Sequence, residues 1–284
     1  MKKETILQSN LVTYGRYKFS SWQINCLVNI VDKLQPAMTT DISWLTADFD
    51  EFRKHLNLSK DGTLEIEIDP DDVERNRHGV AVLNEIKKLF NQSVYYTYTD
   101  EKGEVFHRTC HLIQTMDLSD DGNKVKLGIP VAALRWLIYY GKGVGGTLYD
   151  KNSVLALRGT YSKRVFQLLS GKYSKRIWEV PIADLAYGLM TPEYTTQNFE
   201  NFVLVPAKKE LANNPESRLM FKYCLVSKGE YKRRGRKKLD TVVFKIYDKK
   251  YQKECDDFVN DNWEEEYIKC LKQNKYDPDI QNTK

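Results

Sequence analysis

The feature that most constrains the fold is an order of elements that occurs twice along the chain. In the first half, "SSWQINCLVNIVDKL", "DFDEFRKHLNL" and "HGVAVLNEIKKLFNQ" place apolar residues at helical spacing. Ser20 or Ser21 is the expected N-cap of the first helix. The alternating "TLEIEID" predicts a strand, and "SVYYTYTDEKGEVFHRTCHLIQTMDL" predicts two strands around a turn. "NKVKLGIP" adds a strand, after which Pro130 begins another helix.

The second half repeats this order. A helix is predicted from near Ser153 to Gly171, followed by the strand "RIWEVPI" and the short helix "IADLAYGLM". "QNFENFVLVPAKKELANN" predicts a long helix capped by Thr195 or Thr196, and "LMFKYCLV" and "TVVFKIYD" predict a hairpin. Helices followed by a hairpin with a long basic loop form the skeleton of a winged helix. We therefore expect an α+β fold with two tandem winged-helix domains, at 10–150 and 151–250, and an acidic, partly helical C-terminal tail at 251–284.

Charge is distributed unevenly over these three parts. Residues 1–150 carry a net charge of −3, residues 151–250 carry +12, and residues 251–284 carry −4. A strongly basic domain between mildly acidic segments is typical of a protein that holds nucleic acid with one part of its chain. The alternative is a solvated surface of lysine and arginine.

The tetrapeptide YSKR occurs twice, at Tyr161–Arg164 and at Tyr173–Arg176. On one helix, words twelve residues apart would differ by about 120° and would not share a face. We place the first word on a helix and the second in the turn beyond Gly171, so no structural repeat is expected. Ser162, Lys163 and Arg164 are predicted to point outward and to grip the same polyanion as the second word.

The sequence lacks the motifs that would indicate other classes of DNA-associated or nucleotide-binding protein. A nicking enzyme of the rolling-circle type needs two histidines separated by one residue, and none of the four histidines has that spacing. His107 and His111 are four apart, but their segment reads as a strand rather than as a zinc-binding helix. "GKGVGG" at 141–146 follows a helix and precedes a strand, which is the wrong context for a dinucleotide loop. No GxxxxGK[ST] loop occurs either.

Five scattered cysteines indicate neither disulfides nor a zinc site, so we expect no metal and no cofactor. No apolar run approaches the roughly 20 residues of a membrane span, and "MKKETILQSN" has no signal-peptide core. We expect a cytoplasmic protein that is not an enzyme.

The order of "YSKRVFQLL", "WEVPIADLAYGL", "FENFVLVPAKKELANN" and "FKYCLVSKG…KKLDTVVFKIYD" resembles the C-terminal domain of plasmid replication initiator (Rep) proteins of the iteron-binding tandem winged-helix family. "SNLVTYGRYKFSSWQINCLVNIV" is similar to the family's opening helix, so the resemblance covers roughly residues 10 to 250. The family often has basic residues at the centre of its second recognition helix, where this chain has Glu200, Asn201 and Phe202.

The resemblance implies that the C-terminal domain binds double-stranded DNA, and two kinds of contact are predicted there. Residues on the helix after Thr195 are expected to meet the DNA, and their amides and exposed aromatic ring suit A·T-rich direct repeats: Thr196, Gln197, Asn198, Asn201, Phe202 and Lys208. Val205 is a further candidate for a thymine methyl. Phosphate contacts are assigned to the basic residues of the YSKR words with Ser162, and to the hairpin loop: Ser162, Lys163, Arg164, Lys175, Arg176, Lys228, Lys232, Arg233, Arg234, Arg236, Lys237 and Lys238.

The N-terminal domain is expected to make weaker DNA contacts around the helix near residue 80, through Arg75, Arg77, His78, Lys87 and Lys88. By resemblance it also serves dimerisation, with dimers that repress their own gene and monomers that initiate at the repeats. A host initiator and a replicative helicase are the implied further partners. The sequence leaves open whether the tail packs on the body or meets a host protein. A winged-helix transcriptional regulator without an initiator role is the alternative function.

Overall fold

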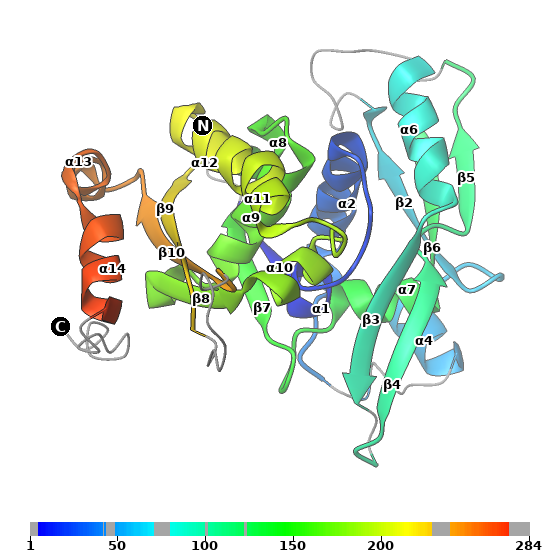
Figure 1. Ribbon diagram of the computed structural model, residues 1–284. Coiled ribbons are helices and arrows are strands. Elements are labelled where there is room, and N and C mark those ends of the chain that lie inside the picture. The colour runs from blue at the N-terminus through cyan, green and yellow to red at the C-terminus, as the bar shows by residue number, and fades with distance from the viewer. Residues whose placement is uncertain are drawn as a thin grey trace.

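The computed structural model describes residues 5–41, 43, 49–70, 80–99, 102–121, 124–228 and 239–272. Two halves lie side by side, and the C-terminal helices form the outer edge of the second half (Figure 1). The N-terminal half contains these elements: β1 (Thr5–Ser9), α1 (Asn10–Thr13), α2 (Ser21–Lys33), α4 (Phe49–Leu56), β2 (Thr63–Ile68), α6 (Val80–Phe90), β3 (Ser93–Thr99), β4 (Val105–His111), β5 (Thr115–Leu118), β6 (Val125–Pro130) and α7 (Val131–Ile138).

The C-terminal half begins at the strand that follows the glycine-rich turn. Its elements are β7 (Gly146–Asp150), α8 (Lys151–Ala156), α9 (Thr160–Gly171), β8 (Ile177–Pro181), α10 (Ile182–Gly188), α11 (Thr196–Phe199), a π turn (Glu200–Leu204), α12 (Val205–Asn213), β9 (Leu219–Val226) and β10 (Thr241–Asp248). The predicted single helix from Ser153 to Gly171 is wrong. The chain is extended at Leu157 and Gly159, which separates α8 from α9.

The two halves share one sheet topology. In the first half the strand order is β2-β6-β5, and in the second half it is β8-β10-β9. In each sheet the last strand of the unit lies in the centre and pairs antiparallel with both of its neighbours. Each first strand is separated from the last pair by at least one helix, α6 or α10 to α12, which is the winged-helix arrangement. The predicted α+β fold of two tandem winged helices is confirmed.

The sequence pattern suggested that β3 and β4 form the hairpin of the first winged helix, but they lie outside its sheet. The β3–β4 hairpin pairs in register from Ser93 with His111 to Thr99 with Val105, and it forms a separate two-stranded sheet. The terminal strand pair of the first sheet is instead β5–β6. Alternation of apolar residues identifies a strand but not its partner, so the sequence pattern could not separate the added hairpin from the sheet.

Helix α9 lies at the centre of the molecule. It contacts α1 and α2 of the first half, and α8, α12 and β9 of the second half. One continuous apolar core therefore extends through both halves, with Ile24 and Leu27 of α2 and Val165, Phe166 and Leu169 of α9 all within it. The two winged helices do not have separate cores joined by a linker.

The beginning of the chain crosses the junction between the halves. Strand β1 pairs antiparallel with β7, from Thr5 with Asp150 to Ser9 with Gly146. Between α7 and β7, residues 141–146 form a tight turn in which Val144 N–H donates to the Gly141 carbonyl at 3.0 Å. The Asn10 amide donates to the Val144 carbonyl at 2.9 Å. The glycine-rich segment thus links a helix to a strand, as its context predicted.

The described part of the tail, up to Lys272, packs on the body. Helices α13 (Gln252–Asn260) and α14 (Trp263–Lys272) lie beyond β9 and β10 (Figure 1). Trp263 and Tyr267 are buried with Cys224, Val226 and Val243 of those strands in a second, smaller apolar cluster. The first of the two alternatives that the sequence left open, packing on the body, is therefore observed for α13 and α14. None of the helices in the described part of the chain has the length and apolar character needed to cross a membrane.

Candidate nucleic-acid interface

The long helix of the second half runs from Thr196 to Asn213 as α11, the π turn and α12. Its N-cap is Thr195, whose hydroxyl accepts the Asn198 N–H at 3.2 Å. A row of four apolar side chains holds the helix against the core, because each is at most 1% exposed: Phe199, Val203, Ala207 and Leu211. The four residues are spaced four apart along the sequence.

The opposite face of this helix is open. Gln197, Asn198 and Asn201 are exposed, and the exposed fractions of Phe202 and Val205 are 59% and 46%. The Phe202 ring meets the ring of Tyr194 edge-on with a centroid separation of 6.1 Å. The predicted outward direction of Gln197, Asn198, Asn201 and Phe202 is confirmed. Amide and apolar side chains therefore share one solvent-facing surface, formed by these four residues and Val205, which we call the reading face.

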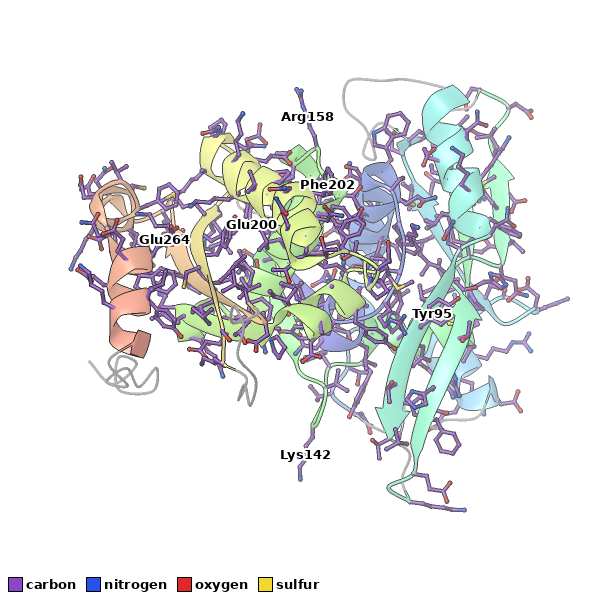
Figure 2. All side chains as sticks on the ribbon, in the orientation of Figure 1. Tyr95, Lys142, Arg158, Glu200, Phe202 and Glu264 are labelled. Atoms are coloured by element: carbon purple, nitrogen blue, oxygen red, sulfur yellow. The ribbon has the colours of Figure 1, made fainter. Side chains whose placement is uncertain are left out.

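Glu200, the acidic residue at the centre of this helix, is turned away from the reading face. The Tyr223 hydroxyl of β9 donates to its carboxylate at 3.0 Å. Burial raises the pKa of Tyr223, and the nearby Glu200 carboxylate raises that pKa further. Glu200 and Phe202 lie on different sides of the helix in Figure 2. The departure from the family's basic pattern consequently adds no carboxylate to the reading face.

Lys208 does not face outward with the reading face, and the prediction of its direction is wrong. Its Nζ lies 3.0 Å from the Glu264 carboxylate of α14 and 5.4 Å from the ring centre of Tyr223. The tail supplies this acidic partner, which sequence periodicity within the helix alone could not reveal. Thr196, at the other end of the helix, is half-buried and donates to the Leu239 carbonyl at 3.4 Å.

The last three residues of the first YSKR word are buried, so the prediction that they point outward is wrong. Ser162, Lys163 and Arg164 are exposed by 2%, 0% and 4%. Lys163 Nζ donates to Asn25 Oδ1 of α2 and to the Val154 carbonyl of α8, both at 2.6 Å. In this structure the three side chains cannot reach a phosphate, because α9 is enclosed by both halves.

Arg164 makes the second link between the halves. It donates to the Gly15 carbonyl at 2.9 Å and to the Tyr17 hydroxyl, and its guanidinium carbon lies 4.1 Å from the centre of the Tyr17 ring. Burial lowers the pKa of Arg164, while burial raises the pKa of Tyr17. A planar guanidinium suits this site because it stacks and donates at the same time.

The second YSKR word lies in the turn beyond α9, as expected. Lys175 is exposed at the end of the 3₁₀ turn Tyr173–Lys175. Arg176 is half-buried over the Tyr173 ring at 4.2 Å, and it pairs with Glu254 of the tail at 2.7 Å. Of this word only Lys175 remains an open cation.

The remaining predicted phosphate contacts divide into described and undescribed residues. Lys228 follows β9 and pairs with Glu179 of β8, and Lys87 and Lys88 are exposed on α6. The other predicted cations lie outside the described residues: Arg75, Arg77, His78, Lys232, Arg233, Arg234, Arg236, Lys237 and Lys238.

Two exposed cations near the long helix were not selected from the sequence. Lys209 is exposed on α12, and Arg158 points outward just before α9 (Figure 2). The carboxylate of Glu210 on α12 accepts the Gly159 N–H at 3.0 Å, which places Arg158 beside that helix. The four-residue spacing of Asn201, Val205 and Lys209 could have identified the lysine, whereas Arg158 depends on the packing of α9 against α12.

The histidine pair does not form a metal site. His107 and His111 both lie on β4, where four residues span about 13 Å, too far for one ion to bind both. His107 instead shares a hydrogen bond with Thr97 across the hairpin at 3.0 Å. Throughout the described ranges, no three His, Cys, Asp or Glu side chains gather as metal ligands would.

Comparison with known proteins places this geometry in context. The family model described as "Initiator Replication protein, WH1" matches residues 5–170, which is more than half of the chain. No curated protein matches the chain.

Solved structures give further similarities. The crystal structure of Pi initiator protein in complex with iteron DNA is 15% identical with a TM-score of 0.51, over 86% of this chain and 97% of that one. Domains 2 and 3 of RctB are 10% identical with a TM-score of 0.36, over 72% of this chain and 81% of theirs. The likeness to Pi shows that the two proteins share a fold.

Proposed function

Because this chain belongs to the initiator replication protein family, we propose that it initiates plasmid replication by binding directly repeated sites in double-stranded DNA. The observation that carries the proposal is the reading face of the long helix. There Asn198 and Asn201 are exposed on the unit whose residues 151–250 carry a net charge of +12. A protein of the same fold has been solved in complex with iteron DNA, which supports the same class of ligand.

The reading face has the chemistry of major-groove recognition. Asn and Gln can each make two hydrogen bonds to an adenine edge, and apolar side chains contact the thymine methyl group. Asn198, Asn201 and Gln197 supply the amides, and Phe202 and Val205 supply exposed apolar groups. An A·T-rich repeat is the sequence that this surface suits.

Phosphate contacts supply affinity and register without sequence information. We assign them to Lys175 and Lys228, and to the basic loop between β9 and β10, where six lysines and arginines fall within residues 232–238. Lys87 and Lys88 of α6 give the N-terminal unit a weaker contact. Ser162, Lys163 and Arg164 have no part in the proposed interface.

The N-terminal unit serves dimerisation in this proposal. Dimers repress the chain's own gene, and monomers bind the repeats and meet a host initiator and replicative helicase in the cytoplasm. The protein does no chemistry on DNA. Supercoiled origin plasmid incubated with the protein and magnesium should stay unnicked, and a site-specific nick would overturn this part of the proposal.

A footprint of the purified protein on the DNA around its own gene tests the function. Protection of several direct repeats is expected, together with loss of the replicon when the gene is disrupted. The alternative is a winged-helix regulator without an initiator role. Protection of a single inverted repeat, with the replicon maintained in the absence of the gene, would establish that alternative.

A further inference from the structure

The long helix is interrupted by a π turn at Glu200–Leu204. The Val205 N–H donates to the Glu200 carbonyl, five residues back, where an α-helix would use the carbonyl of Asn201. Pro206 follows at once. In an uninterrupted α-helix its ring would collide with the Phe202 carbonyl four residues back, and it has no N–H to donate. The wider turn removes that collision, so the proline explains the position of the π turn.

The π turn also explains why one row of residues can stay buried. Phe199 and Leu211 are twelve residues apart, and in a regular α-helix they would differ by about 120° around the axis. A π turn acts as a one-residue insertion and removes about 100° of that difference. Accordingly, no side chain of the buried row is more than 1% exposed: Phe199, Val203, Ala207 and Leu211.

The same shift aligns the exposed side of the helix. Gln197, Asn201, Val205 and Lys209 repeat every four residues, and all four are exposed. Without the π turn, Gln197 and Lys209 would point about 120° apart, and no single groove could receive both. With it, they form one row about 18 Å long.

We propose that the π turn held by Pro206 determines DNA specificity by aligning Gln197, Asn201, Val205 and Lys209 into one contact row. This inference rests on the proposed binding of DNA by the reading face. The amides at the N-terminal end of the row meet base edges, Val205 meets a thymine methyl, and Lys209 meets a backbone phosphate. The turn therefore sets base contacts and a phosphate contact in one fixed register.

Lys209 is the one charged residue in this row of four. Its neighbour Lys208 is paired with Glu264 at 3.0 Å on the side of the tail. Lys209 is exposed and lies one helical turn beyond Val205, next to the reading face. By contacting a phosphate at the far end of the row, its ammonium group can fix the register of the helix relative to the base pairs.

The first test replaces the proline. Pro206→Ala restores a backbone N–H and removes the ring, so the helix is free to become regular. The ratio of affinity for the repeat to affinity for random DNA should fall at least tenfold, and random binding should weaken by no more than it does in Lys209→Gln. Pro215→Ala, at an exposed proline beyond the helix end, is the control and should keep the ratio. Backbone NMR of the variant reports whether the π turn has been lost.

A repeat-to-random ratio that stays intact in Pro206→Ala overturns the inference, whether or not the π turn persists. Failure of the proposed function gives a different result. In that case the unaltered protein itself would not prefer the repeat over random DNA.

The second test holds even if Pro206→Ala does not fold. Lys209→Gln in the native chain should reduce the salt slope of binding by about 1 and weaken repeat and random DNA alike. Lys253→Gln, at an exposed lysine of the tail helix α13, should change neither. In the Pro206→Ala background, the two residues no longer share a row. We therefore expect that Asn201→Ala no longer lowers affinity for the repeat, or that Lys209→Gln no longer reduces the salt slope. An unchanged salt slope in Lys209→Gln excludes Lys209 from the row and overturns the proposal.

Discussion

Lys163 of α9 donates a hydrogen bond from Nζ to Oδ1 of Asn25, which lies 138 residues earlier on α2, at a distance of 2.6 Å. The same ammonium group bonds the Val154 carbonyl near the end of α8 at 2.6 Å. Helices α2 and α9, which belong to different halves, are therefore joined by a cation that is fully enclosed. A residue that the sequence suggested for binding DNA instead holds the halves of the protein together.

Replacing Lys163 with methionine should destabilise the protein without changing DNA contacts. The apolar stem is kept, but the Asn25 amide oxygen and the Val154 carbonyl are each deprived of a charged donor. We expect the free energy of unfolding to fall by about 2–4 kcal/mol in urea denaturation. Lys253→Met on the tail surface is the control. A Lys163 variant with unchanged stability and a reduced salt slope would instead support a phosphate contact by this lysine.

Replacing Asn198 or Asn201 with alanine should lower affinity for the cognate repeat by about 1–3 kcal/mol for each bidentate pair of hydrogen bonds to a base that the change removes. Binding to random DNA should barely change, since random binding depends on phosphates. Competition titrations with repeat and random duplexes measure both affinities. Asn213→Ala, at an exposed position on the far end of the same helix, serves as the control. Equal weakening on both duplexes would show that this helix does not read the repeat.

Replacing Arg233, Arg234 and Arg236 together with alanine should weaken binding to all DNA sequences to a similar degree. The prediction rests on sequence, since these arginines lie outside the described residues. Removing up to three phosphate contacts should flatten the salt dependence by about 1 unit of slope for each of them. Affinity measured across a salt series tests this. An unchanged slope would remove the loop from the interface.

Acid should weaken the protein through Asp248 at the end of β10. Burial alone would raise the pKa of its carboxyl, but hydrogen bonds from Arg218, from the Lys250 N–H and from Tyr173 outweigh burial and hold the pKa below its ordinary value. A lowered folded-state pKa stabilises the protein above the unfolded value of about 3.9, and that contribution disappears as the pH falls through the folded-state pKa.

Asp248→Asn should therefore lose stability at neutral pH and show a shallower decline below about pH 4 than the native protein. Urea denaturation at a series of pH values measures both effects. Asp256→Asn, at an exposed position on α13, is the matched control. Identical pH profiles for Asp248→Asn and the native chain would mean that this carboxylate is not linked to folding.

Most helices and strands could be predicted from the sequence because the forces that define them are local. Ser20 caps α2 by accepting the Gln23 N–H, as its position before an apolar stripe indicated. Four-residue spacing also marks the buried row from Phe199 to Leu211 and the exposed amides Gln197 and Asn201, although in a regular α-helix residues at that spacing would drift by about 120° over the row. The π turn kept that spacing in phase, and Pro206 was its visible mark in the sequence.

What only the tertiary structure decided was which side chains stay accessible after the units meet. The two YSKR words are chemically identical, yet Arg164 is buried against Tyr17 while Arg176 stacks on Tyr173 at the surface and pairs with Glu254. Periodicity describes how residues face around one helix axis, and it contains no information about a second helix packed on the polar side. Contacts between distant segments decided that α9 is covered by α2, that Lys208 meets Glu264, and that β5 rather than β4 pairs with β6.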